Sequence, residues 1–122
     1  MTVEASLSSP RARPSGAVEA SIRFLMDEGW TINGPRPAAG LVPLTISAPG
    51  GHFVTGPTRF PEGTAYARES VVILPLRVRP TAPAGPAPVR LSVRFQACRG
   101  DRCEAPESVV LEAPFEIETG RR

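Results

Sequence analysis

Cys98 and Cys103 are the only cysteines in the chain, and their spacing implies a chemical reaction. Fully extended, the segment between them would span roughly 16 Å, whereas the Cα atoms of a disulfide lie about 5.5 Å apart. A bond between the two sulfurs therefore requires the chain to reverse direction. Gly100 and Asp101 lie between the cysteines and favour turns. The spacing thus predicts a bridge across a tight loop.

The shortness of this loop argues against a purely structural role. In the chain-entropy model a loop of about six residues contributes roughly 2 kcal/mol, against about 4.7 kcal/mol for a loop near a hundred residues. Upstream residues alternate between an apolar face (Val89, Leu91, Val93, Phe95, Ala97) and a polar face (Arg90, Ser92, Arg94, Gln96, Cys98). A pair that joined two sheets would be expected on apolar faces and far apart in sequence. The predicted polar-face position of Cys98 favours redox exchange, and a structural disulfide stays open as the alternative.

A metal site is the weakest interpretation of the pair. Zinc usually takes four ligands, and His52 is the only strong nitrogen ligand that the chain adds to the two thiols. His52 follows two glycines, which predicts an exposed loop residue. We expect no metal ion here.

Composition predicts one domain over residues 1–122. The chain has 41% apolar residues and no apolar run long enough to cross a bilayer, so we expect no direct membrane insertion. Fifteen prolines and eleven glycines favour short strands over long helices. The basic residues are all arginines, scattered and without a stripe of aromatic side chains, so nucleic-acid binding is not expected.

The first residues lack a basic segment followed by an apolar run, so no signal peptide is predicted. Two interpretations fit: a cytosolic protein, in which a lasting disulfide would be unusual, or a domain separated from its targeting segment.

Period-two alternation predicts several short strands. We expect them at residues 18–26, 41–46, 71–78, 89–97 and 108–117, with a turn at Pro14, Ser15 and Gly16 and a rigid connection over residues 80–88. Pro43 is expected to mark an edge or a bulge, and Pro75 is expected to interrupt the strand at residues 71–78. Six to eight short antiparallel strands in one domain of this size predict a β-sandwich.

The order of several motifs carries a family resemblance. The most specific is Phe95-Gln96-Ala97-Cys98 followed by a short loop and Cys103; supporting segments are Pro14-Ser15-Gly16, Gly29-Trp30-Thr31-Ile32-Asn33, and Tyr66 leading into residues 71–78. Over nearly its whole length the chain resembles the N-terminal periplasmic domain of the DsbD family of thiol:disulfide interchange proteins, or disulfide bond corrector domain. The resemblance implies an immunoglobulin-like fold, a periplasmic or extracytoplasmic location, and a longer parent chain from which this domain is excised.

The same resemblance implies roles for three residues. Cys103 would form mixed disulfides as the nucleophile, and Cys98 would be the resolving thiol. Tyr66 would belong to a cap loop that shields the pair until a partner binds. Trp30 is expected to anchor the core or its edge.

The implied partners are thioredoxin-fold proteins. A thioredoxin-like domain of the same parent chain would supply electrons. A periplasmic disulfide isomerase or a cytochrome-maturation thioredoxin would receive them, without any bound cofactor. The chain departs from the family pattern at two places. Glu104-Ala105-Pro106 stands where many members have an apolar residue and two prolines, which affects the surface that a partner would contact. Alanines flank Tyr66 in place of the usual aromatic residue and glycine, which implies a shallower cap loop. A non-catalytic binding or scaffolding module with a hairpin disulfide is the alternative function.

Overall fold

A computed structural model describes residues 1–120; Arg121 and Arg122, the last two residues of the predicted domain 1–122, lie outside the described residues. Within residues 1–120 the chain is all-β, with no helix and therefore none that is long and apolar enough to span a bilayer. The strands are β1 (Thr2–Leu7), β2 (Arg11–Ala12), β3 (Ala17–Leu25), β4 (Trp30–Asn33), β5 (Thr45–Ser47), β6 (Phe53–Thr55), β7 (Ala65–Ala67), β8 (Glu69–Val78), β9 (Gly85–Pro86), β10 (Val89–Phe95), β11 (Ala97–Arg99), β12 (Arg102–Cys103), β13 (Glu107–Ala113) and β14 (Glu116–Ile117).

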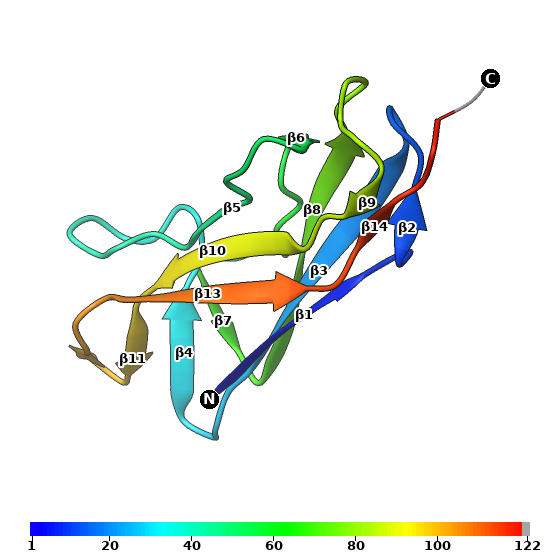
Figure 1. Ribbon diagram of the computed structural model, residues 1–122. Coiled ribbons are helices and arrows are strands. Elements are labelled where there is room, and N and C mark those ends of the chain that lie inside the picture. The colour runs from blue at the N-terminus through cyan, green and yellow to red at the C-terminus, as the bar shows by residue number, and fades with distance from the viewer. Residues whose placement is uncertain (121–122) are drawn as a thin grey trace.

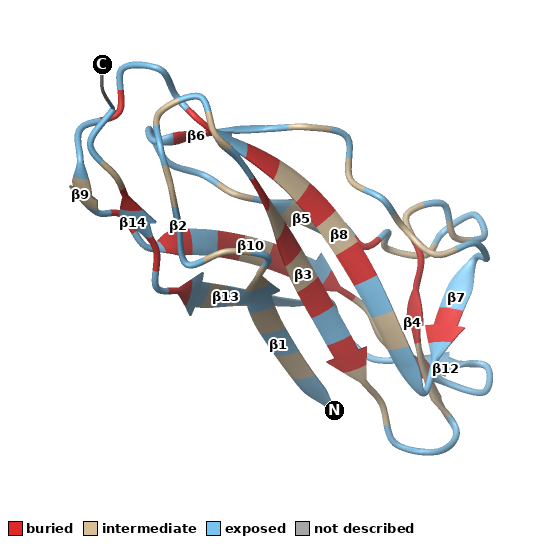
Figure 2. Cartoon of the chain, turned by 90° about the vertical axis from the view of Figure 1, so that its right-hand side faces the viewer, coloured by how far each residue is buried: buried red, intermediate tan, exposed pale blue. Residues whose placement is uncertain are grey.

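Two of the sheets enclose the hydrophobic core. One has the order β1-β3-β8-β6 and the other the order β13-β10-β5, all with antiparallel neighbours. Buried bands alternate with paler ones along β3 and β8 (Figure 2), because successive side chains point to opposite faces. The buried side chains of β3, β8 and β10 belong to one apolar cluster. Each large side chain that it removes from water contributes about 1.5–3 kcal/mol to the fold.

The remaining two sheets lie at opposite ends of the molecule. The sheet β2-β14-β9 includes a parallel pair, β2 with β14. The sheet β12-β11-β4-β7 carries both cysteines, and Figures 1 and 2 place it at the far end from β14. The chain leaves β10 at Gln96 and enters β11, so residues 89–99 pass from one sheet into another.

The predicted strands agree with the structure in position more than in extent. Predicted strand 89–97 divides at Gln96, and strand 108–117 divides after Ala113 because Pro114 lacks a backbone donor. In place of the strand predicted over residues 41–46, the structure has only the short strand β5 (Thr45–Ser47). The connection predicted over residues 80–88 contains the short strand β9. Strand β1 was not predicted, although its alternate residues Val3, Ala5 and Leu7 pack against the core.

Pro75 does not interrupt its strand, contrary to the prediction. β8 runs continuously from Glu69 to Val78. The carbonyl of Pro75 accepts a hydrogen bond from the Gly56 amide at 2.9 Å. In an antiparallel strand the N–H and C=O of one residue point the same way, so the missing donor faces Gly56 and no bond to β3 is lost.

The turn at Pro14 and Ser15 forms as predicted. The Gly16 amide donates to the Arg13 carbonyl at 2.8 Å, and Ser15 has a φ of 67°. Proline at the second position and positive φ at the third correspond to a type II turn.

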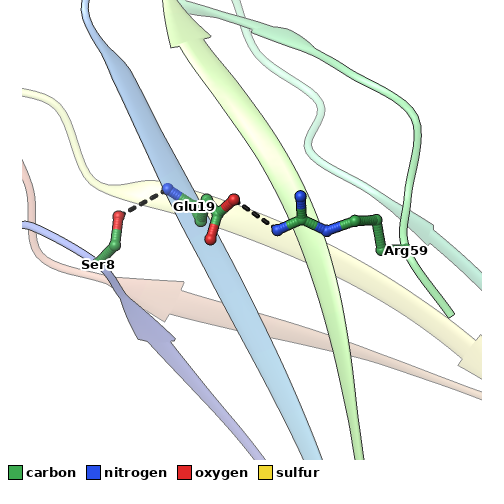
Figure 3. Close-up of polar contacts among 3 residues, drawn as sticks. All are labelled: Ser8, Glu19 and Arg59. Carbon is green, nitrogen blue, oxygen red and sulfur yellow. Dashed lines mark hydrogen bonds and ion pairs between the residues drawn. The ribbon is translucent and has the colours of Figure 1, made fainter. Parts of the chain in front are cut away.

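Exposed polar contacts tie three neighbouring segments together on the outer face of the first sheet (Figure 3). The Glu19 amide on β3 donates to Ser8 Oγ at 2.8 Å, and the Arg59 guanidinium, reaching across β8, donates to Glu19 Oε2 at 2.5 Å. Both charged side chains of this pair are about half exposed, so water screens their attraction.

Candidate redox site

A disulfide joins Cys98 on β11 to Cys103 on β12. The two residues are direct partners in the antiparallel ladder, with Cα atoms 4.0 Å apart. Arg99 pairs with Arg102, so Gly100 and Asp101 form a two-residue turn. Gly100 has a φ of 62°, as a type II′ turn requires at its first central position, and glycine adopts this conformation without steric cost. The predicted bridge across a tight loop is confirmed.

The two cysteine residues differ in their exposure to solvent. Cys103 is exposed, whereas Cys98 is only 5% exposed. The sequence predicted the solvated face of the strand for Cys98, and that prediction is wrong. The segment after β4 folds back here, and its residue Val42 is hydrogen-bonded to Gln96 and Asn33. An external thiolate therefore meets the sulfur of Cys103 first.

Asn33 supplies the polar contact to the buried sulfur. It is the only buried polar residue among residues 1–120, at 3% exposure. Its Nδ2 donates to the Val42 carbonyl at 3.0 Å and to Gln96 Oε1 at 2.8 Å, and its Oδ1 lies 3.8 Å from Cys98 Sγ. The sulfur of a disulfide carries no hydrogen, so this contact becomes a hydrogen bond only when Cys98 is a thiol.

Gln96 connects the two sides of the site. Its Oε1 also accepts from the Val42 amide at 2.9 Å, while its Nε2 donates to the Glu104 carbonyl at 3.1 Å. The Glu104 amide donates to the Ala97 carbonyl at 2.9 Å. These bonds hold the chain that follows Cys103 against β11, independently of the disulfide.

Sequence reasoning gave no role to Asn33 or to the Gln96 side chain. Both residues lie within the motifs that carried the family resemblance, but their contacts join residues 63 positions apart. The one available signal was an asparagine in a short apolar strand, where a buried amide needs partners.

A hollow of about 380 Å³ lies beside the exposed cysteine. Its lining consists of Trp30, Arg99, Arg102, Cys103 and Glu104. Trp30 is half-buried at the start of β4 and lines this hollow, and it is not among the hydrophobic residues that pack against the core, so the expected core or core-edge anchor is not found. The charges around Cys103 are mixed, since Arg99 and Arg102 favour a thiolate whereas Asp101 and Glu104 oppose it.

The structure does not bring Tyr66 and the disulfide together. β4 separates β7 from β11, an offset of about 10 Å across two strand spacings. Tyr66 pairs with Ile32, whereas Cys98 pairs with Thr31, so the two side chains leave opposite faces of the sheet. The Tyr66 ring lies in the core, where its hydroxyl donates to the Pro61 carbonyl at 2.6 Å and burial raises the hydroxyl pKa above its usual value of 10.0.

Other candidate ligands lie apart from the cysteines. His52 is exposed in a loop, as predicted. Within residues 1–120, no group of three or more His, Cys, Asp and Glu side chains is arranged to hold a metal ion.

The fold and site define an all-β protein with a hairpin disulfide whose second cysteine is an exposed residue. No protein-family model matches the chain, and no curated protein matches it.

Proposed function

We propose that this chain is a thiol-disulfide exchange domain, an immunoglobulin-like β-sandwich of the DsbD N-terminal type. In this proposal the Cys98–Cys103 pair passes electrons from a thioredoxin-like donor to disulfides of extracytoplasmic thioredoxin-fold partners. The two core-enclosing antiparallel sheets are consistent with a sandwich. The motif around the cysteines is the basis of the family assignment.

The unequal exposure of the two cysteine residues is the observation that carries the proposal. A purely structural disulfide would stabilise the hairpin equally well if neither cysteine were exposed beside a hollow. An exchanging pair requires an accessible sulfur, because the attacking thiolate must reach it. Here that sulfur belongs to Cys103, the residue to which the family resemblance assigns mixed-disulfide formation.

The exchange consists of balanced thiolate displacements. A donor thiolate attacks Cys103 Sγ, a mixed disulfide forms, and Cys98 leaves as a thiolate that takes a proton from solvent. The second donor thiol then displaces Cys103, which leaves the domain as a dithiol and the donor as a disulfide. In the second half-reaction the Cys103 thiolate attacks an acceptor disulfide. Cys98 then resolves the mixed disulfide, which releases the reduced acceptor and restores the Cys98–Cys103 bond. Tyr66 has no part in these steps, because its ring lies in the core.

Trapping of a mixed disulfide tests the roles of the two cysteines. We expect the Cys98→Ser protein to accumulate a mixed disulfide with an oxidised thioredoxin-fold protein, and the Cys103→Ser protein to form none. A Cys98→Ser/Cys103→Ser protein is the control for non-covalent association. Trapping by Cys103→Ser alone would reverse the assigned roles, and trapping by neither variant would contradict the exchange proposal.

A binding or scaffolding module with a structural clip is the second candidate function. The direct pairing of the cysteines in one hairpin favours it, since such a bond pins two short strands. The reduction potential separates the two functions. Equilibration in graded thiol/disulfide buffers, followed by alkylation and mass analysis, is expected to give about −180 to −270 mV for an exchanging pair. A value below about −300 mV would mark a structural bond.

A further inference from the structure

The buried amide of Asn33 has a contact that the exchange steps above do not use. Asn33 lies on β4, the strand next to β11, and its Oδ1 is 3.8 Å from Cys98 Sγ. Both nitrogen-bound hydrogens of the amide are engaged by carbonyl oxygens, those of Val42 and the Gln96 side chain. The amide therefore has one satisfied orientation, in which its oxygen faces the sulfur.

An oxygen held against a cysteine sulfur distinguishes between the protonation states of that cysteine. A thiol can donate a hydrogen bond to the oxygen, whereas a thiolate has no hydrogen and is repelled by the carbonyl dipole. Cys98 is 5% exposed, so little water is available to solvate its negative charge. Both effects favour the protonated form.

We propose that Asn33 is a positioning residue that keeps Cys98 in its thiol form after the disulfide opens. This inference rests on the proposed function, since it concerns the resolving thiol of the exchange. A thiol does not attack, so a mixed disulfide at Cys103 lasts until Cys98 loses its proton. Asn33 thus lengthens the lifetime of the mixed disulfide at Cys103, and it makes Cys98 less reactive than Cys103.

Charged side chains around Cys98 do not provide this effect. The elements against it are β11, β12, β4 and the segment after β4. Strand β4 carries no charge, and the others carry Arg99, Arg102, Asp101, Glu104 and Arg36, all of them exposed. Asn33 is the buried polar residue of the described part of the chain, residues 1–120, and its amide oxygen lies 3.8 Å from the sulfur.

Titration of the Cys98 thiol in a Cys103→Ala background tests the inference without any partner. The thiolate is followed by its ultraviolet absorbance, which does not depend on access of a reagent to the buried sulfur. We expect Asn33→Leu to raise the thiolate fraction of Cys98 by about three- to fivefold at a given pH below the midpoint, the usual effect of one lost hydrogen bond. Thr31→Val is the matched control. It lies on the same strand and removes a contact of 3.5 Å to the Cys98 carbonyl but leaves the sulfur untouched, so we expect no change.

Asn33→Asp keeps the test decisive if Asn33→Leu does not fold. It retains an oxygen at this position, so the thiolate fraction is expected to stay at or below that of the parent. An unchanged titration in Asn33→Leu, an equal shift in Thr31→Val, or a raised thiolate fraction in Asn33→Asp would each overturn the inference. If Asn33→Leu raises the thiolate fraction as expected but the trapping experiment yields no mixed disulfide, the result would contradict the exchange function and leave the effect of Asn33 on Cys98 standing.

Discussion

Reduction of the Cys98–Cys103 bond is expected to leave the domain folded and to lower its free energy of unfolding by about 2 kcal/mol. That figure is the chain-entropy value for a closed loop of about six residues. The full value applies here, because the Glu104 amide to Ala97 carbonyl bond and the Gln96 to Glu104 bond keep the hairpin in place in the reduced protein, so the change lies in the entropy of the unfolded chain. Domains of this size are stable by about 5–15 kcal/mol, so the fold survives the loss.

Urea unfolding with and without a thiol reductant measures this difference. Fluorescence of Trp30 reports on the hairpin end of the molecule, and circular dichroism reports on the sheets. With a urea slope of about 1–3 kcal/mol/M, the midpoint is expected to fall by about 1 M. A Cys98→Ala/Cys103→Ala protein is the control, since its midpoint should lie near that of the reduced protein and ignore the reductant.

A loss above about 4 kcal/mol, or unfolding on reduction alone, would refute this reasoning. The bond would then be a structural staple, and a domain that unfolds when reduced could not cycle between dithiol and disulfide.

Three substitutions test other contacts. Tyr66→Phe removes the hydrogen bond to Pro61 and is expected to cost about 1 kcal/mol in urea unfolding while leaving the exchange rate unchanged; a slower or faster exchange would indicate a cap role. Burial raises the Tyr66 pKa, so above pH 10.0 the unfolded chain ionises first and stability should fall with rising pH, an effect that a stability profile of Tyr66→Phe should lack. Gln96→Ala removes three hydrogen bonds, to Asn33 on β4, to Val42 in the segment after β4 and to Glu104 after β12, and is expected to lower the free energy of unfolding by about 2 kcal/mol. A change below about 0.5 kcal/mol would show that these bonds contribute little to stability. Arg59→Ala should cost less than about 1 kcal/mol, and the cost should shrink further with added salt, because its partner Glu19 is about half exposed.

Alternation along the chain predicted the central strands correctly. Val89, Leu91, Val93 and Phe95 are buried as predicted, because a strand between the core and solvent must segregate its side chains. β3 and β8 follow the same rule. The turn at Gly100 and Asp101 was also predictable, since its residue types impose local geometry.

Burial of Cys98 was not predictable from the same pattern. Alternation gives the side of a strand to which a residue points, but it does not reveal what covers that side. Here Asn33 contacts the Cys98 sulfur, and hydrogen bonds link Asn33 to Val42 and Gln96, which lie far from one another in the sequence. A contact between residues so far apart in sequence has no local signature, and neither has the transfer of the chain between sheets at Gln96.

At the tip of the β11–β12 hairpin, backbone conformation restricts one residue, whereas packing restricts none. Its residues are exposed, and a Cβ atom at Gly100 would meet nothing within 4 Å, so backbone conformation alone restricts that position. Asp101 and Arg102 are exposed and do not pack against the core, so we expect substitutions there to leave the core intact. Substitutions that change the charges at the tip are therefore expected to leave the fold intact. Under the proposed exchange function, the tip could alter the choice of partner without changing the buried Cys98 or the Asn33 amide beside it.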